Sequence, residues 1–424
     1  MYQNKIYEIK STDDIELNIK RESKLEFKVS FDEAKEMKAL LVFISGIRDI
    51  DYAGYEEHLA EFVVKEFEVA VLRVDYHCIG FRPQTGATFY MDKKDKEIFS
   101  KQCEEISLFC NIDVGLPDDF LNDECLEQIQ VQGVLSSLDD ILQRLKDENK
   151  IPQDYRTPLS INLKPTKNEY QNFGLMQALD IINAIYFVRK NHAEFKLAKT
   201  PKTLLFGTSH GGYLAFLCAK FAPWLIDAVV ENSGYVTAPL RFLGFGREID
   251  YINCFEVSTD SMFKNLALFI STKTFWTIDK SSPNVYTEAH DKIRSMPEYD
   301  HLAIQANLHK AIFVSYHSAL DANIALPAAK EKLFDMLKQL DYNARLKMIK
   351  DESECDGKFI KNLEHGMGMS IKTLIKKELP PLLKMKFTHP KNEKKEIAYK
   401  SENLEYHFKE KAQNGGIELN INKK

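Results

Sequence analysis

Two patterns of hydrophobic and polar positions alternate in the first 75 residues, and they predict different elements. The segments "IELNI" (15–19) and "KLEFKVSF" (24–31) alternate with a period of two, which predicts an antiparallel hairpin or two edge strands. An unbroken apolar run at 39–46 is typical of a buried parallel strand, and 69–75 is predicted to be a second buried strand. A helical pattern over 56–67 separates the two predicted strands, so this part of the chain predicts a strand–helix–strand unit.

The same rhythm returns after residue 172 and continues to residue 385. Apolar residues at helical spacing predict a long helix over 174–192, and the following strand, turn and helix occupy 204–224. A final helix over 370–383 is expected to end at the Pro380-Pro381 pair, because proline cannot continue a helix. The other predicted core elements are strands at 226–235, 311–321 and 344–351 and a helix at 328–340.

Two segments interrupt this rhythm. Residues 84–172 are polar and helical in pattern over 123–148, and residues 236–309 are irregular and rich in aromatic side chains. We predict that both are helical cap insertions within one domain of residues 1–385, and that they set specificity. Their aromatic residues either line an acyl or sugar pocket or form the small core of the cap. The Lys-rich segment 386–424 is expected to be a peripheral C-terminal extension.

The composition argues against nucleic acid and membranes as binding partners. The 424 residues are 44% hydrophobic and carry a net charge of −6, so no basic field would attract nucleic acid or anionic lipid. No apolar run approaches the roughly 20 residues of a membrane-spanning helix, and the first residues lack a signal-peptide pattern. Seven cysteines without a C-x-x-C pair are expected to be reduced, with no metal site, in a cytoplasmic protein.

The segment "LLFGTSHGGYLAFLCAKFAPW" (204–224) contains the strongest candidate chemistry. Gly207 to Gly211 reads G-x-S-x-G between a predicted strand and a predicted helix, the context of a nucleophile elbow. Such a turn strains the central residue and lifts the oxygen of Ser209 above the edge of the sheet. The alternative is a glycine-rich connection in which Ser209 only caps the following helix.

A nucleophilic serine needs a base, and the base needs an acid. The expected chain order is serine, acid, histidine, and the next strand ends offer Asp321 and then His365. Gly366 and Gly368 are expected to let the backbone pack closely around the imidazole ring. Residues that we also weighed, and rank lower, are His317 and His210 as histidines and Glu231, Asp356 and Glu364 as acids.

Two backbone amides are expected to bind the negative oxygen that forms during attack. The amide of His210 lies at the start of a helix, whose dipole favours an anion. The second donor is expected after the first buried strand, in "FISGIRDIDYAGY", where the amide of Ile47 has the right position. Arg48, at the rim of the same loop, is a weaker candidate for binding an anionic substrate group.

These motifs resemble the α/β-hydrolase superfamily over roughly residues 39–385. The stretches "GTSHGGYLA" and "HSALDANIALP" are most similar to its esterase and prolyl-oligopeptidase branch. The resemblance implies an eight-stranded, mostly parallel sheet, a Ser-His-Asp triad and no cofactor. The chain departs from that branch in having Ser45-Gly46 where His-Gly is usual, a longer segment before His365, and no N-terminal propeller.

The whole chain also resembles a bacterial family of this fold whose members occur in flagellin-glycosylation gene regions. That resemblance implies an acylated sugar or glycan ester as substrate. The leading hypothesis is therefore a serine hydrolase that cleaves a carboxylic ester of a small molecule or glycan. The alternatives are an acyltransferase that uses the same three residues and a catalytically silent binding protein of this fold.

Overall fold

The computed structural model describes residues 1–46, 53–78, 87–116, 120, 125–165, 167–240, 244–253, 255–257, 262–387, 395–411 and 415–423. The chain forms two compact units. Unit 1 comprises Met1–Pro83, Asn172–Pro239 and Tyr286–Lys424, and unit 2 comprises Gln84–Gln171 and Leu240–Val285.

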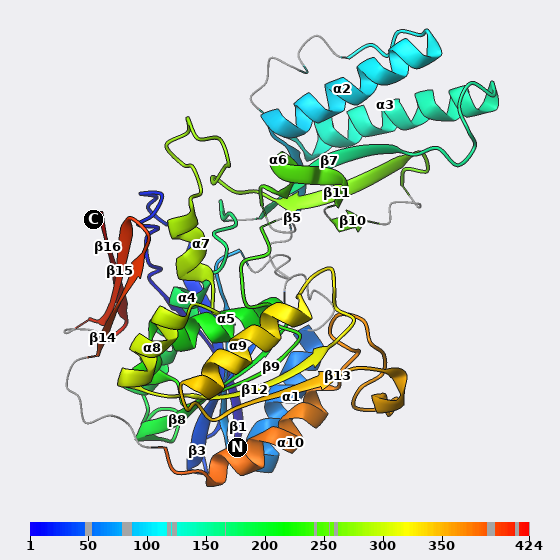
Figure 1. Ribbon diagram of the computed structural model, residues 1–424. Coiled ribbons are helices and arrows are strands. Elements are labelled where there is room, and N and C mark those ends of the chain that lie inside the picture. The colour runs from blue at the N-terminus through cyan, green and yellow to red at the C-terminus, as the bar shows by residue number, and fades with distance from the viewer. Residues whose placement is uncertain are drawn as a thin grey trace. The chain divides into compact units, whose positions relative to one another are not determined.

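An eight-stranded sheet is the core of unit 1 (Figure 1). β2 is antiparallel to both of its neighbours, β1 and β4, and every other pair is parallel. The mostly parallel, eight-stranded sheet implied by the resemblance is thus present. Its strands, in spatial order, are β1 (Tyr2–Ile9), β2 (Leu25–Asp32), β4 (Ala70–Asp75), β3 (Met37–Ile44), β8 (Leu197–Thr208), β9 (Ala228–Asn232), β12 (Ile312–Ser318) and β13 (Ala344–Ile349).

Helices cover both faces of this sheet, which explains why strands such as β9 and β12 are buried at every residue and not at alternate ones. Figure 1 shows α1 (Ala53–Phe67) and α10 (Ile371–Lys384) together on one face. The other face carries α4 (Leu175–Lys190), α5 (His210–Phe221) and α9 (Pro327–Gln339). All five residues of β9 and all seven of β12 are buried between these layers.

The register of the sheet brings the carboxyl ends of four strands to one edge. Ile44 of β3 pairs with Gly207 of β8, and Thr208 pairs with Asn232 of β9. Asn232 in turn pairs with Tyr316 of β12. In open parallel sheets this edge is where ligands bind.

The predicted strand at "IELNI" is wrong. β1 lies earlier, at Tyr2–Ile9, and residues 15–18 form turns closed by a bridge between Asp14 and Ile19. A side-chain oxygen of Asp14 accepts the amide of Leu17, and the carboxylate of Glu16 is buried in an ion pair with Arg294. The alternation therefore reflects a turn that buries one charged side chain, not a strand.

The final helix does not end at its prolines. α10 continues through Pro380 and Pro381 to Lys384. Each proline removes one backbone donor and clashes with the preceding turn, so the continued helix must be stabilised by other contacts. Burial of Leu379 and Leu382 on either side of the prolines favours the continued helix.

Unit 2 is not the helical insertion that we predicted, because it contains a sheet of its own. The strand order is β10-β11-β7-β5-β6, and β7 and β11 are parallel although they are distant in sequence. Residues 286–309, expected in the second insertion, belong instead to unit 1 as α7 (Glu288–Arg294) and α8 (Tyr299–Leu308). The elements of unit 2 are β5 (Ala87–Met91), α2 (Lys93–Cys110), β6 (Leu126–Glu127), α3 (Gln128–Asp147), β7 (Thr157–Pro165), α6 (Gly246–Asp250), β10 (Phe255–Val257) and β11 (Leu266–Thr272).

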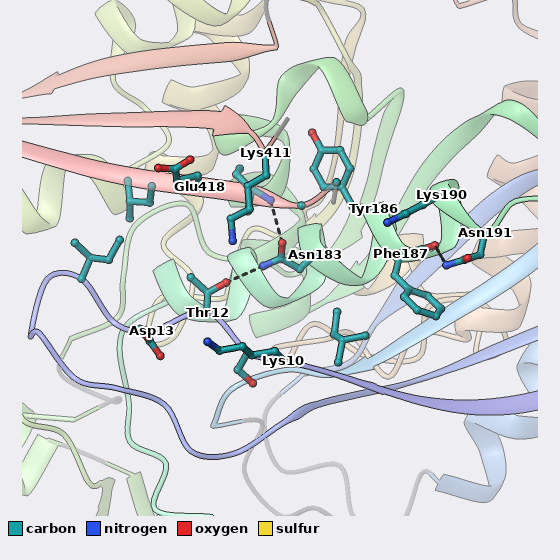
Figure 2. Close-up of a pocket in the computed structure, with 17 residues that line it drawn as sticks. Lys10, Thr12, Asp13, Asn183, Tyr186, Phe187, Lys190, Asn191, Lys411 and Glu418 are labelled. Carbon is teal, nitrogen blue, oxygen red and sulfur yellow. Dashed lines mark hydrogen bonds between the residues drawn. The ribbon is translucent and has the colours of Figure 1, made fainter. Parts of the chain in front are cut away.

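The C-terminal segment forms a three-stranded antiparallel sheet of β14 (Glu396–Ser401), β15 (Leu404–Glu410) and β16 (Ile417–Lys423). Figure 2 shows Asn183 of α4 between this sheet and the N-terminal segment, beside a cavity of about 660 Å³. Its amide nitrogen donates to Thr12 Oγ1 at 2.9 Å, and its oxygen accepts the Ile417 amide at 3.0 Å. The extension is therefore joined to the core of unit 1.

Within the described part of the chain, none of the helices combines the length and the apolar character needed to cross a bilayer. The same residues contain no group of three or more His, Cys, Asp or Glu side chains arranged to hold a metal ion. None of the cysteines in these residues forms a disulfide.

Candidate active site

The turn at Ser209 joins the end of β8 directly to the start of α5. Ser209 has φ 50° and ψ −119°, a conformation that is strained for any residue with a side chain. A Cβ atom on Gly211 would lie 2.0 Å from the carbonyl oxygen of Ile44, and one on Gly207 would lie 2.4 Å from the Gly211 oxygen. Both flanking glycines are therefore required by close backbone approach. The Ser209 side chain makes no capping bond to the helix, so the alternative of a simple helix cap is wrong.

Three side chains that are distant in sequence form one hydrogen-bonded chain at this edge of the sheet. Ser209 Oγ lies 2.8 Å from His365 Nε2. His365 Nδ1 lies 2.6 Å from Asp321 Oδ2. With the Nδ1–H donating to the carboxylate, Nε2 is free to accept the serine proton. The side chain of Asp321 is 2% exposed, whereas that of His365 is 19% exposed and accessible from solvent.

Asp321 is held in its charged form. Its other oxygen accepts the backbone amides of Ala325 at 3.2 Å and Ile324 at 3.4 Å. Burial alone would raise the pKa of Asp321, but the hydrogen bond and the charge of His365, together with the Ala325 amide, lower it below its ordinary value. An ionised Asp321 can orient the imidazole and stabilise it when it becomes protonated.

The loop that carries His365 depends on glycine for a different reason from the predicted one. Gly366 has φ 82°, and no atom lies within 4 Å of the position of a Cβ. Close packing around the imidazole is therefore not the constraint, and the positive φ is. The loop is also anchored by Ser318 Oγ, which donates to the Leu363 carbonyl at 2.5 Å.

A cavity of about 550 Å³ opens beside the serine and the histidine, within the size range of small-molecule sites. Phe43 and Met369 contribute apolar side chains to its wall, and Lys361 and Glu56 contribute charged ones. The described residues that line it are Phe43, Tyr55, Glu56, Thr208, Ser209, Asn232, Lys361, His365, Gly366, Gly368, Met369, Ser370 and Ile371.

The two other histidines that we weighed are buried and do not line this cavity. His210 Nε2 contacts Gln177 Oε1 at 3.2 Å, its Nδ1 contacts the Tyr235 hydroxyl, and burial lowers its pKa to about 3. His317 Nε2 donates to the Ala325 carbonyl at 2.8 Å. Burial, and then the nearby Lys330 charge, lower the pKa of His317 to about 4. Both rings are therefore neutral at physiological pH.

The three alternative acids have other partners. Glu231 pairs with Lys330, Asp356 accepts backbone amides of its own loop, and Glu364 is bonded by Asn362. Of the described carboxylates, Asp321 is thus the one that contacts His365.

Two predicted residues, Ile47 and Arg48, lie outside the described residues. The loop before them is described as far as Gly46, and the Ser45 carbonyl accepts the Tyr76 hydroxyl at 2.9 Å. The residue that the sequence reasoning missed is Asn232, whose side chain lines the cavity and donates to the Gly366 carbonyl at 3.0 Å. The polar run "ENSG" (231–234) at the end of a buried strand was the available signal.

A family model described as "Protein of unknown function (DUF2920)" matches residues 5–421. The chain belongs to this family. No curated protein matches the chain.

Several solved structures show a distant likeness. Esterase Est22 is 10% identical, with a TM-score of 0.39, over 82% of this chain and 71% of the esterase. The acylaminoacyl peptidase of Pyrococcus horikoshii is 12% identical, with a TM-score of 0.41, over 92% of this chain but only 42% of the peptidase. Carboxyl esterase 2 of the fungus Tuber melanosporum is 10% identical, with a TM-score of 0.37, over 90% and 84% of the two chains.

Proposed function

We propose that this protein is a serine hydrolase of the α/β-hydrolase type that cleaves a carboxylic ester. The observation that carries the proposal is the continuous chain of two hydrogen bonds, 2.8 Å and 2.6 Å long, from Ser209 through His365 to Asp321. The strained turn at Ser209 and the cavity beside it give further support, because they present the hydroxyl to a bound molecule. A silent binding protein would need neither feature.

In the proposed mechanism, Ser209 Oγ attacks the acyl carbon while His365 Nε2 takes the serine proton. The protonated His365 is stabilised by Asp321 and then gives the proton to the leaving alcohol. The product of this half-reaction is an acyl-enzyme on Ser209. Water, deprotonated by His365, then attacks the acyl carbon and releases the carboxylic acid and the free serine.

The oxyanion is proposed to bind the backbone amide of His210 and that of Ile47. His210 is the first residue of α5, so its amide belongs to the helix N-terminus, which favours negative charge. Arg48 is proposed as a contact for an anionic substrate group. We propose a small-molecule or glycan ester as the substrate, because a cavity of about 550 Å³ has room for one such group.

The experiment that tests this function is labelling with a fluorophosphonate, which reacts with activated serines and does not require knowledge of the natural substrate. We expect one covalent adduct per wild-type chain, mapped to Ser209 by mass spectrometry. The Ser209→Ala variant should not be labelled, and its stability should be nearly that of the wild type.

Ser30→Ala is a matched control, because Ser30 is a buried serine of β2 and not part of the site. It should be labelled like the wild type. Absence of an adduct on the wild type, or equal labelling of Ser209→Ala, would refute the proposal. A screen of acyl esters of increasing chain length and of acetylated sugars would then identify the substrate, and product analysis with added acceptor alcohols would separate hydrolysis from acyl transfer.

A further inference from the structure

The segment 231–234, which we call the turn 231–234, comprises the last two residues of β9 and the two residues at which the chain turns away from the sheet. It contacts the surroundings of all three residues of the proposed triad. It consists of Glu231, Asn232, Ser233 and Gly234, and all four are buried. Sequence reasoning considered this segment only as a strand end with one alternative acid. Its hydrogen bonds join it to the segments that carry the serine, the histidine and the aspartate.

On the nucleophile side, the turn binds the backbone of the elbow. The Ser209 amide donates to the Asn232 carbonyl at 2.8 Å. The first turn of α5 packs against the same segment, since a Cβ on Gly212 would lie 2.9 Å from the Gly234 Cα. The strained position of Ser209 is therefore defined relative to the turn 231–234.

On the histidine side, the turn binds both the backbone amide and the backbone carbonyl of Gly366, the residue after His365. Asn232 Nδ2 donates to the Gly366 carbonyl at 3.0 Å, and the Gly366 amide donates to Ser233 Oγ at 3.1 Å. The Ser233 hydroxyl donates in turn to Asn232 Oδ1 at 2.9 Å. These three bonds form a closed ring that fixes Gly366, and hence the neighbouring imidazole, against the end of β9.

On the acid side, the turn binds the helix that follows the Asp321 loop. One oxygen of Glu231 lies 2.8 Å from Lys330 Nζ in the first turn of α9, and the other accepts the Gly234 amide at 2.6 Å. The side chains of Glu231 and Lys330 are 0% and 1% exposed. His317 holds the far end of the same loop through the Ala325 carbonyl, and the Ala325 amide binds Asp321.

A buried ion pair of this kind is poorly explained by stability. Desolvation of two charges offsets most of their attraction, and apolar replacements of similar volume are often as stable. What the pair does provide is a directional link between the end of β9 and the helix after Asp321. The same carboxylate also fixes Gly234, so one side chain relates the acid loop to the turn that holds the serine and the histidine.

We propose that the turn 231–234 is the positioning element of the active site, and that Asn232 and Glu231 are positioning residues for His365 and Asp321. Neither side chain takes part in proton transfer. The inference rests on the proposed function, because it assigns these residues a role in the reactivity of Ser209. The second-order rate constant of fluorophosphonate labelling measures that reactivity without a known substrate.

The first test compares two buried asparagines of unit 1. Asn232→Ala removes the bond to Gly366, whereas Asn172→Ala removes a bond to Asp14 at 2.9 Å that lies outside the site. We expect Asn232→Ala to slow labelling of the folded protein by about 10- to 100-fold, since small misplacement of reacting groups has effects of this size. Asn172→Ala should be less stable but label at the wild-type rate.

The isosteric change Asn232→Asp is the second variant, in case Asn232→Ala does not fold. It keeps the acceptor for the Ser233 hydroxyl but places an oxygen opposite the Gly366 carbonyl. We expect slow labelling of the folded protein here also, with a urea midpoint below that of the wild type, because the buried carboxylate faces a carbonyl oxygen.

The second test separates position from stability at the ion pair. Glu231→Gln leaves Lys330 buried without its partner and should be strongly destabilised. Adding Lys330→Met removes both charges and should recover much of the stability. If the pair positions Asp321, the labelling rate constant of the double variant stays at least 10-fold below that of the wild type. The pH at which its labelling rate is half-maximal also shifts. If the pair only stabilises the fold, the double variant labels like the wild type.

The outcomes distinguish the two proposals. Labelling of wild-type Ser209 together with wild-type rates in Asn232→Ala, Asn232→Asp and the double variant would overturn the positioning role and leave the hydrolase proposal intact. Absence of labelling on the wild type would overturn the hydrolase proposal itself, and the positioning role with it.

Discussion

Each of the two units contains a cluster of polar side chains that are largely buried. The cluster in unit 1 borders a cavity and includes a strained residue, whereas the cluster in unit 2 consists of side chains that pair with one another. In unit 1, Ser209 and His365 border a cavity, and the serine backbone is strained. In unit 2, Arg247 of α6 is 4% exposed and contacts Asp92, Asn162 and Ser271. Strain and a bordering cavity characterise a cluster that can react, whereas pairing of charged and polar side chains with one another characterises a cluster that holds a helix on a sheet.

The units also differ in their titratable residues. All 11 histidines lie outside the two segments of unit 2. In unit 1, burial lowers the pKa of His210 to about 3 and that of His317 to about 4. In unit 2, burial and the charge of Asp92 raise the pKa of Asp95 to about 7, against the opposing effect of Arg247. Acid should therefore affect the two units with opposite sign.

The largest expected effect separates chemistry from stability in unit 1. Asp321→Asn should lower the labelling rate of Ser209 by about 10⁴-fold, because an amide favours the wrong tautomer of the imidazole. The free energy of unfolding should change little. The rate of fluorophosphonate labelling and a urea titration measure the two quantities.

Asp227→Asn is the matched control for that change. Asp227 is also a fully buried aspartate of unit 1, but it accepts the Thr203 amide at 2.7 Å. It should lower stability and leave the labelling rate of the folded protein unchanged. A similar loss of rate in both variants would contradict the distinct role of Asp321.

The next effect should appear in unit 2 alone. Arg247→Met leaves Asp95 and Asp92 without their cation and should destabilise unit 2 by about 3–5 kcal/mol. Labelling of Ser209 should keep its wild-type rate. The two tryptophans make the measurement specific, since Trp224 belongs to unit 1 and Trp276 to unit 2, and both are buried.

Urea unfolding of Trp224→Phe and Trp276→Phe backgrounds, followed by fluorescence, reports each unit separately. A shift of the Trp276 signal with an unchanged Trp224 signal is the expected result for Arg247→Met. Equal shifts of both signals would show that the units unfold together, and a slower labelling rate would show that the two clusters are coupled.

The smallest expected effect is the response to pH, at about 1–2 kcal/mol for each group between pH 8 and pH 5.5. A buried neutral histidine stabilises the fold above its unfolded pKa of about 6.5, and this contribution is lost as the pH falls. A buried aspartate with a raised pKa behaves oppositely, and its contribution is lost as the pH rises from about 4 through 7. Unit 1 should therefore weaken on acidification while the Asp95 contribution strengthens unit 2.

The same tryptophan reporters measure this response. Asp95→Asn should abolish the rise in the Trp276 midpoint on acidification, and His210→Gln should reduce the fall in the Trp224 midpoint. Parallel pH dependence of both signals in the wild type would contradict the assignment of opposite signs.

Local patterns were enough to predict the elements around the candidate site. The G-x-S-x-G stretch at 207–211 specifies a strand, a tight turn and a helix by short-range sterics, because only glycine fits beside the Ile44 carbonyl. The order of strand ends along the chain was enough to rank Asp321 and His365 first, although it left other carboxylates open as the acid. The prediction that α10 ends at its two prolines was wrong, because burial of Leu379 and Leu382 outweighed the local tendency of proline to end a helix.

Local patterns could not predict features that depend on contacts between segments far apart in the sequence. β7 carries two prolines and reads as a loop, and it becomes a strand by pairing with β11, where Ile161 faces Ile270. The partner of Asn232, the Gly366 carbonyl, lies 134 residues away along the chain.

The sequence alone determined the parallel core, the bent turn at Ser209 and the three residue types of the proposed triad, because periodicity and backbone sterics act over a few residues. Only the tertiary structure decided which carboxylate meets His365, that unit 2 contains a sheet, and that the turn 231–234 joins the nucleophile, base and acid. Those outcomes depend on which polar groups from distant segments are buried together, and a local sequence pattern contains no information on that burial.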